Sequence, residues 1–294
     1  MRKEVLFIYN PSSGKAVASQ LISETVQLLC ENNCRVTVYA IGENLGAEQV
    51  LLEEDGKFTN IICCGGDGTL NHTINGIMQM EHKPLLTYIP TGSTNDFASS
   101  LGISRDVSDA VNAVVNSRPY YYDIGKFGNT YFNYIAAFGA FTEVSYSTSQ
   151  IQKNYLGHAA YVIEGIRHLP IGQYHTVTVT HEGETFTDDY IYGSVSNSTS
   201  VGGMSIPVKD EILMNDGLFE VILIKAPKTI LDLQSIIAAL LIQNFDSQFI
   251  QYFKTNNIHF EFVKETPWTL DGEFGGNVTS TEISVINQAI PLLK

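Results

Sequence analysis

The segment Gly65-Gly66-Asp67-Gly68-Thr69 constrains the fold of this chain more than any other feature of its sequence. It follows an apolar run at residues 60–64 and precedes residues 70–80, which have the apolar spacing of a helix. Three glycines within four positions lose much conformational entropy, which a plain connection would not require. They let backbone N–H groups approach an anion closely at the start of a helix. The pattern therefore predicts a strand, a phosphate-binding turn and a helix.

Two further turns carry the same signal. Residues 10–15 read Asn-Pro-Ser-Ser-Gly-Lys after a strand pattern at 5–9, and residues 90–97 read Pro-Thr-Gly-Ser-Thr-Asn-Asp-Phe after one at 85–89. Parallel strands of an open sheet bring such turns to one edge, where ligands bind. Taken singly, the first turn suits an ordinary loop and Asn95-Asp96 suits a helix cap. All three in order predict one phosphate-binding site.

Phosphate-binding signatures of other enzyme classes are missing from the sequence. Gly14-Lys15 has no glycine five positions before Gly14, so it is not a Walker A loop. No GxGxxG motif opens a helix, and the HRD and DFG triplets of protein kinases are absent.

The hydrophobic patterns predict two domains of different class. Strands alternate with helices over the first part, which predicts a parallel sheet covered on both faces. The expected strands are 5–9, 35–41, 60–64 and 85–89, and the expected helices are 16–32, 46–55, 70–80, 95–101 and 108–117. Short β-rich runs separated by turn pairs follow. They lie at 120–127, 129–137, 175–181, 184–194, 218–224, 258–263 and 280–286, with helical insertions at 159–169 and 230–244.

The fold prediction is therefore α/β. It consists of a doubly wound, parallel-sheet, nucleotide-binding domain at residues 1–122 and an antiparallel β-sandwich domain at residues 123–294.

Composition excludes several classes of function. The formal net charge of −14 over 294 residues argues against a nucleic-acid partner and against electrostatic adsorption to anionic membranes. No apolar run approaches the roughly 20 residues of a membrane span, and the first apolar segment is too short for a signal peptide. The four cysteines show no CxxC pairing, which predicts buried thiols. We expect a cytoplasmic protein, and transient contact with the inner face of the membrane is left open.

With these motifs, the chain resembles the bacterial diacylglycerol kinase catalytic-domain family, which includes soluble diacylglycerol kinases and YegS-type lipid kinases. The resemblance runs through nearly the whole chain. Besides the three turns it rests on residues 156–161, Gly202-Gly203 with Pro207, residues 215–218, and Leu270-Asp271-Gly272-Glu273. It implies an NAD-kinase-like first domain and an ATP-dependent lipid kinase that transfers the γ-phosphoryl group to a lipid alcohol. Diacylglycerol is the first guess for that alcohol.

The resemblance also implies roles for individual residues. Asp67 and Asp96 would lie in a Mg²⁺–water network beside ATP, and Glu273 would be the general base, with Asp271 beside it. The residues expected to hold the nucleotide are Asn10, Pro11, Ser12, Ser13, Gly14, Gly65, Gly66, Asp67, Gly68, Thr69, Leu70, Asn71, Ser93 and Asn95. A structural Mg²⁺ is expected at Leu213, Asp216 and Leu218.

Plainer interpretations of the late motifs stay open. Residues 270–273 alone suit a glycine-containing turn with exposed acids, and residues 215–217 suit a hairpin turn. The acceptor is expected to be a lipid alcohol, at or extracted from a membrane surface, that enters between the domains. Aromatic side chains at β spacing either line its path or pack as core, and alternation favours core. These are Phe132, Tyr134, Phe138 and Phe141.

Two rival functions remain. An NAD kinase shares the GGDGT turn but carries an Asn-Glu motif after it, which this chain lacks. A noncatalytic nucleotide sensor of the same fold would have lost its acids, whereas this chain retains Asp67, Asp96 and Glu273. A homodimer is also left open.

Overall fold

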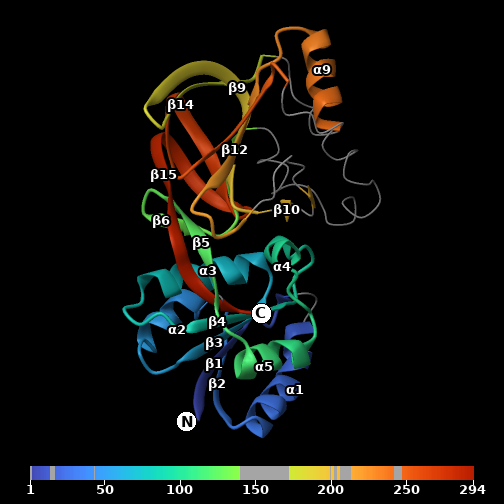
Figure 1. The fold of residues 1–294 in the computed structure, drawn as a ribbon, viewed down its shortest axis with the longest axis vertical. Coiled ribbons are helices and arrows are strands. Elements are labelled where there is room, and N and C mark those ends of the chain that lie inside the picture. The colour runs from blue at the N-terminus through green and yellow to red at the C-terminus, as the bar shows by residue number, and fades with distance from the viewer. Residues whose placement is uncertain are drawn as a thin grey trace. The chain divides into compact units, whose positions relative to one another are not determined.

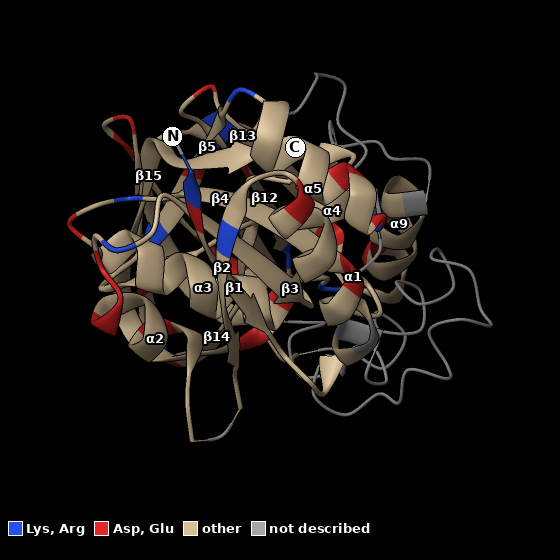
Figure 2. Ribbon diagram, turned by 90° about the horizontal axis from the view of Figure 1, so that it is seen from below, with Lys and Arg blue, Asp and Glu red and all other residues tan. Residues whose placement is uncertain are grey.

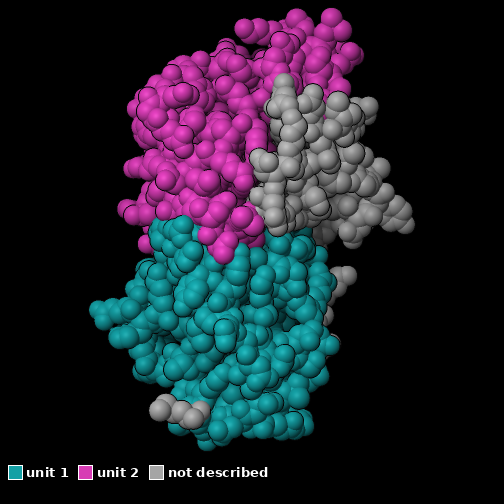
Figure 3. All heavy atoms as spheres, viewed as in Figure 1, with its two compact units in different colours: residues 1–124, 286–294 teal, residues 125–285 magenta. Residues whose placement is uncertain are grey.

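The computed structural model describes residues 2–13, 17–42, 44–139, 172–198, 200–201, 204–205, 213–241 and 247–294. Backbone contacts divide the chain into two compact units (Figure 3). Unit 1 comprises residues 1–124 and 286–294, and unit 2 comprises residues 125–285. The sequence analysis assigned everything after residue 122 to the second domain. Residues 286–294 belong instead to unit 1, because Leu292 and Leu293 pair in parallel with Leu86 and Thr87.

Unit 1 is a parallel sheet with helices in alternation. Its elements are β1 (Lys3–Tyr9), α1 (Val17–Glu31), β2 (Cys34–Ala40), α2 (Ala47–Glu53), β3 (Asn60–Gly65), α3 (Asp67–Gln79), β4 (Leu85–Pro90), α4 (Asp96–Leu101) and α5 (Val107–Asn116). The strand order is β4-β3-β1-β2, and the last residues of β15 (Glu273–Leu293) pair beside β4. The predicted α/β architecture of the first domain is confirmed.

Helices cover both faces of this sheet, because successive side chains of a strand point to opposite sides. Val5, Phe7 and Cys64 pack in one core cluster with α1 and α5. Cys63 points the other way, where the Thr73 hydroxyl of α3 lies 3.4 Å from its Sγ. Helix α1 packs against α5 and α2 against α3 (Figure 1). Burial raises the pKa of both the Cys63 and Cys64 thiols to about 12.

The order of the strands places a topological switch between β1 and β3. The chain passes from β1 to β2 on one side, then returns to β3 on the other side of β1. Ligands of open α/β sheets bind beyond the carboxyl ends of the strands at such a switch. The turns after β1 and β3 are the two that leave the sheet at this place.

Unit 2 is an antiparallel β structure. Its elements are the end of β5 (Tyr120–Phe127), whose first part belongs to unit 1, β6 (Thr130–Phe132), β7 (Ile135–Gly139), β8 (His175–His181), β9 (Glu184–Ser196), β10 (Ser200–Val201), β11 (Met204–Ser205), β12 (Phe219–Lys225), α9 (Ile230–Leu241), β13 (Ile250–Thr255), β14 (Asn257–Leu270) and most of β15. The predicted antiparallel class is confirmed. The strand β13 was not predicted, and the helix expected at 159–169 lies outside the described residues.

Two long strands join the parts of this β structure. The first part of β9 pairs with β8 and its last part with β7. Strand β14 likewise pairs with β8 through its first part and with β7 through its last part. Between these parts, its pairing with β15 shifts register from Glu261 to Thr266. These shared strands enclose one core that contains Phe132, Phe138 and Trp268. Phe132 and Phe138 are therefore core residues, as the alternation favoured, while Phe141 lies outside the described residues.

Two expectations drawn from composition can be compared with the structure. Cys34, Cys63 and Cys64 are buried as predicted, but Cys30 is exposed because it lies on the outer side of α1, so that part of the prediction is wrong. Among the described residues, no helix is both long enough and apolar enough to cross a membrane. Lys and Arg are interspersed with Asp and Glu along the described ribbon (Figure 2).

Candidate nucleotide-binding turns and the late acidic turn

The three predicted turns of unit 1 contact one another through hydrogen bonds. The Thr91 N–H donates to Gly65 O at 2.8 Å, which ties the turn after β4 to the end of β3. Asn10 Nδ2 donates to Thr69 Oγ1 at 3.2 Å, and Thr91 Oγ1 donates to Ser13 Oγ at 3.0 Å. Turns whose contacting residues are between 26 and 78 positions apart in the chain thus form one structure.

Glycine is required where these turns approach most closely. A Cβ on Gly92 would lie 2.7 Å from the Gly66 Cα, and a Cβ on Gly66 would lie 3.3 Å from the Gly92 Cα. The side chain of Thr69 occupies the space beside Gly65, where an added Cβ would come within 2.5 Å of it. Close approach of neighbouring atoms, rather than an unusual backbone angle, accounts for Gly65, Gly66 and Gly92.

The N-terminus of α3 provides the donors of this site. Its cap residue, Gly66, makes no side-chain capping bond, and the first intrahelical bond runs from Leu70 N to Gly66 O at 3.0 Å. The N–H groups of Asp67, Gly68 and Thr69 precede that bond, and such groups favour anions. Leu70 is fully buried and its N–H is used by the helix, so it supports the turn from within the core.

The remaining residues of the first and third turns are placed as follows. Pro11 and Ser12 lie in the turn after β1, where the Ser12 N–H donates to Asn10 Oδ1 at 3.0 Å. Gly14 lies outside the described residues. Ser93 lies in the loop between β4 and α4. The described parts of the three turns contain no Lys or Arg, so their affinity for an anion rests on backbone N–H groups and the helix terminus.

Asn95 does not cap its own helix, which was the plainer interpretation of the Asn-Asp pair. It has left-handed backbone angles, φ 56° and ψ 55°, and makes no side-chain cap bond to α4. Its amide reaches back to Gly92, accepting from the N–H at 2.9 Å and donating to the carbonyl at 2.6 Å. The next residue, Asp96, donates its N–H to Asp67 Oδ2 at 3.2 Å. Asn95 therefore shapes the turn that brings the Asp96 backbone N–H to the Asp67 carboxylate.

Tyr88 is a part of this site that the sequence reasoning missed. Its hydroxyl donates to Gly65 O at 3.1 Å and lies 3.3 Å from Asn95 Oδ1, beneath the turns. Burial and the nearby Asp67 carboxylate raise its pKa well above the usual value, so it stays a neutral donor. Its only sequence signal was its place on the strand before the third turn.

The residues present fit a hard cation beside this site. Asp67 is half-buried and Asp96 is buried, and carboxylate oxygens are ligands that suit Mg²⁺. Within the described residues, no group of three or more His, Cys, Asp or Glu side chains is arranged to hold a metal by itself. A cation here would need further oxygen ligands from water or from a phosphate.

The late acidic motif is a two-residue hairpin turn in unit 2. Leu270 and Glu273 are the last pair of the β14–β15 ladder, and Asp271 and Gly272 have positive φ values of 51° and 86°. Two central residues with positive φ are typical of a type I′ turn, for which Asp-Gly is a preferred sequence. The motif is therefore a turn, as its composition alone suggested.

The two acids of this turn have different surroundings. The buried Asp271 carboxylate accepts three backbone N–H groups, from Asn133 at 2.6 Å, Tyr134 at 2.9 Å and Ile135 at 3.0 Å. Glu273 is exposed. Asp271 therefore holds the loop before β7 against the hairpin, and Glu273 is the carboxylate of this turn that solvent reaches.

Several polar groups share the end of the unit 2 sheet where this hairpin lies. The Asp271 N–H donates to Ile135 O. Across the neighbouring strands, Ile135 of β7 pairs with Ser196 of β9. Ser196 pairs with Glu220 of β12, which pairs with Lys254 of β13. Lys254 Nζ lies 3.2 Å from Glu220 Oε1. Burial raises the pKa of the Glu220 carboxyl to about 7. The sequence reasoning missed this pair, because strand alternation does not reveal which polar residue becomes buried.

The residues expected at a structural Mg²⁺ lie just before β12, at the same end of the sheet. Asp216 Oδ1 accepts the Leu218 N–H at 3.0 Å, so the side chain closes a local turn. Asp216 and Leu213 are exposed. One carboxylate together with backbone carbonyl groups fits a cation, but the Asx turn by itself also suits a hairpin. The metal site stays a prediction.

Comparison with solved structures finds proteins of similar fold. A putative diacylglycerol kinase from Bacillus anthracis superposes with a TM-score of 0.80 at 23% identity, over 99% of this chain and 97% of that one. An NAD kinase from Archaeoglobus fulgidus in complex with ATP gives a TM-score of 0.54 at 14% identity, over 99% and 93% of the two chains. The NAD-kinase-like fold predicted for the first domain is thereby supported.

Comparison of sequences then identifies the family. Residues 4–127 match the family model described as the diacylglycerol kinase catalytic domain. The diacylglycerol kinase of Bacillus subtilis is 32% identical over 93% of this chain and 91% of that protein. This chain belongs to the diacylglycerol kinase family, a family of phosphotransferases with an alcohol acceptor.

Proposed function

We propose that this protein transfers the γ-phosphoryl group of ATP to the hydroxyl of a lipid alcohol, with diacylglycerol as the first acceptor to test. The observation that carries the proposal is the mutual contact of three turns around the uncapped N-terminus of α3. Phosphoryl transfer depends mainly on positioning and on charge stabilisation, which such a site supplies. We choose a lipid alcohol as the acceptor because the similar proteins are named diacylglycerol kinases.

In this proposal the nucleotide phosphates lie against the N–H groups of Asp67, Gly68 and Thr69. The triphosphate would then be held mainly by the backbone, with Asn10 and Ser13 at its border. Asp67 and Asp96 would hold a Mg²⁺ ion, which offsets the charge of the phosphates when it is bound.

Glu273 is the proposed general base for the acceptor hydroxyl. A carboxylate can take that proton if it lies within hydrogen-bond reach. Its exposed side chain leaves it available to a substrate, whereas the carboxylate of Asp271 already accepts three N–H groups. Asp271 then supports Glu273 by fixing the turn.

The test is an assay of the purified full chain with ATP labelled at the γ-phosphate, Mg²⁺ and a panel of acceptors. The panel contains diacylglycerol, monoacylglycerol and a sphingoid base in mixed micelles, and NAD in solution. We expect the label in a lipid, and most rapidly in diacylglycerol. Label in NAD alone would assign the protein to the rival phosphotransferase reaction. Binding of ATP with no transfer to any acceptor would favour a nucleotide sensor.

A further inference from the structure

The first turn of α9 exposes two large aliphatic side chains next to each other. Ile230 and Leu231, the first two residues of the helix, are 65% and 72% exposed. The other exposed large hydrophobic residues of the described part of the chain occur singly along the sequence. Single exposed hydrophobic residues are normal on a protein surface, whereas adjacent ones indicate a contact with a partner.

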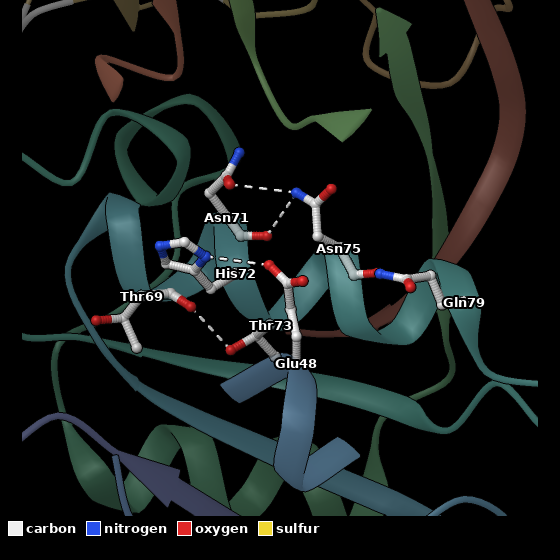
Figure 4. A network of polar contacts seen from close by, with 7 residues as sticks. All are labelled: Glu48, Thr69, Asn71, His72, Thr73, Asn75 and Gln79. Atoms are coloured by element: carbon white, nitrogen blue, oxygen red, sulfur yellow. Dashed lines mark hydrogen bonds and ion pairs between the residues drawn. The ribbon is translucent and has the colours of Figure 1, made fainter. Parts of the chain in front are cut away.

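Helix α3 shows, by contrast, how an exposed helix surface is usually composed. Its exposed residues include His72, whose Nδ1 lies 3.1 Å from Glu48 Oε1, and Gln79, whose Nε2 donates to the Asn75 carbonyl at 2.9 Å (Figure 4). These polar side chains interact with one another as well as with water. The first turn of α9 has apolar side chains in the equivalent exposed position.

The exposure of this turn does not follow from loose packing of the helix. Ile236 and Ala239, further along α9, are buried in one core cluster with Ile222 of β12 and Ile250 of β13. The helix therefore already has an inner face against the sheet. Its first two residues lie outside that face.

Hydrogen bonds hold the first turn of α9 in place. Thr229 Oγ1 accepts the Asp232 N–H at 3.1 Å, and Asp232 Oδ2 accepts the N–H groups of Thr229 at 2.8 Å and Lys228 at 3.0 Å. Such reciprocal caps satisfy the free N–H groups at a helix start and fix its geometry. The two aliphatic side chains are thus presented on a fixed turn.

We propose that the first turn of α9 inserts Ile230 and Leu231 into the surface of the lipid bilayer that carries the acceptor. This inference rests on the proposed function, since it assumes an acceptor that is dissolved in a bilayer. The formal net charge of −14 disfavours electrostatic adsorption to anionic lipid, so contact with the bilayer has to come from apolar side chains. Aliphatic residues on a helix bind membranes through the apolar area that they bury among the acyl chains.

The charged groups beside this turn suit a bilayer surface. Lys228, just before the helix, is exposed and can meet a lipid phosphate. Lys225 Nζ lies 2.6 Å from Asp188 Oδ2, so each neutralises the other. The Asp232 carboxylate accepts two backbone N–H groups of the cap. The turn thereby approaches anionic lipid more readily than the acidic chain as a whole.

The test measures co-sedimentation of the full chain with vesicles of phosphatidylcholine, phosphatidylglycerol and diacylglycerol. The double variant Ile230→Ser, Leu231→Ser should partition about tenfold or more weakly, because the apolar area that enters the bilayer is lost. Its thermal midpoint should match that of the wild type, since both side chains are exposed. Val263→Ser, at a singly exposed residue of β14, is the matched control and should partition as the wild type does. Equal partitioning of the double variant and the wild type, or no binding by the wild type, would overturn the inference.

A fluorescent label reports the contact directly. The exposed Cys30 is first replaced in a Cys30→Ser background, because the other cysteines are buried. A polarity-sensitive fluorophore on Leu231→Cys should shift to shorter wavelength when vesicles are added, and the same fluorophore on Val263→Cys should not. Sedimentation velocity without vesicles tests the other occupant of this surface. A wild-type dimer that becomes a monomer in the double variant would assign the turn to a contact between two copies of the chain and overturn the inference.

The failure of this inference is distinguishable from the failure of the proposed function. The double variant should phosphorylate diacylglycerol in vesicles about tenfold more slowly at limiting vesicle concentration, since its partitioning is weaker. With a short-chain diacylglycerol dissolved as monomers, its rate should equal that of the wild type. Equal rates on vesicles would show that only the role of α9 is wrong. A wild type that binds vesicles through α9 but phosphorylates no lipid would refute the proposed function and leave the contact standing.

Discussion

The glycine-bearing edge of unit 1 and the acidic hairpin of unit 2 are organised on opposite principles. At the edge of unit 1 the backbone supplies the donors, and side chains are absent where turns meet, as at Gly66 and Gly92. At the hairpin of unit 2 the backbone is instead the partner of a side chain, since Asp271 accepts three N–H groups.

Distance along the sequence therefore does not tell whether two acidic residues share an environment. In unit 1 the two acids Asp67 and Asp96 come from different turns and are brought together by a backbone bond. In unit 2 the two acids are separated by one residue, yet one is buried and the other exposed. Asp271 lies in the turn with a positive φ of 51°, whereas Glu273 is already paired with Leu270 in the β14–β15 ladder.

The largest expected effect is at Glu273. Glu273→Gln should lower the rate of phosphoryl transfer about a thousandfold, because the base is lost. The thermal midpoint and the affinity for the ATP analogue should be unchanged, since the side chain is exposed. Initial rates of label transfer measure this, with Glu265→Gln, an exposed glutamate of β14, as the control. A variant that retains a third of the wild-type rate would remove Glu273 from the mechanism.

Substitution of Asp271, in contrast, should lower the stability of the fold. Asp271→Ala leaves three buried N–H groups without their acceptor and places alanine at a positive φ, so we expect a loss of about 3 kcal/mol or more in the free energy of unfolding. Asp271→Asn keeps one acceptor oxygen and tolerates the backbone angle, and should lose less. Urea unfolding measures both. Wild-type stability of Asp271→Ala would mean that these contacts contribute little.

A smaller effect is expected where the backbones meet in unit 1. Gly92→Ala places a methyl group 2.7 Å from the Gly66 Cα and the same distance from Asn95 Oδ1, so the turns must separate. We expect a loss of about tenfold or more in affinity for the ATP analogue, since overpacking shifts the backbone at a cost of about 1–3 kcal/mol. Gly42→Ala is the matched control, because nothing lies within 4 Å of its added Cβ. Equal affinity of the two variants would show that the close approach is irrelevant to binding.

The smallest effect is expected in the core of unit 2. Burial lowers the pKa of His175, whose ring lies edge-on to Phe138 and near Thr266 Oγ1. Because the unfolded chain takes up a proton near the ordinary value of 6.5 and the folded chain does so only at lower pH, stability is lost as pH falls below about 6.5.

His175→Gln should flatten that decline, because glutamine cannot be protonated. Urea unfolding at a series of pH values below about 7 measures the slope. An unchanged slope in His175→Gln would assign the acid sensitivity to other groups.

Much of the first domain could be predicted because each of its signals is local. The alternation of Val5 and Phe7 with their neighbours, and the glycines after β3, depend only on residues a few positions away. The exposure of Cys30 and the burial of Glu220 could not be predicted, since both depend on which elements pack nearby. The end of β15 was likewise assigned to the wrong unit, because its partner in β4 is some 200 residues earlier in the chain.

The amino-acid sequence by itself determined the alternation of strands and helices, the three turns and the Asp-Gly hairpin, because these follow from side-chain period and from backbone preferences of glycine, asparagine and aspartate. Only the tertiary structure decided that Gly66 meets Gly92 and that Asp271 is buried while Glu273 is not. Those outcomes depend on contacts between atoms whose positions are set by the packing of whole elements, which no local pattern contains.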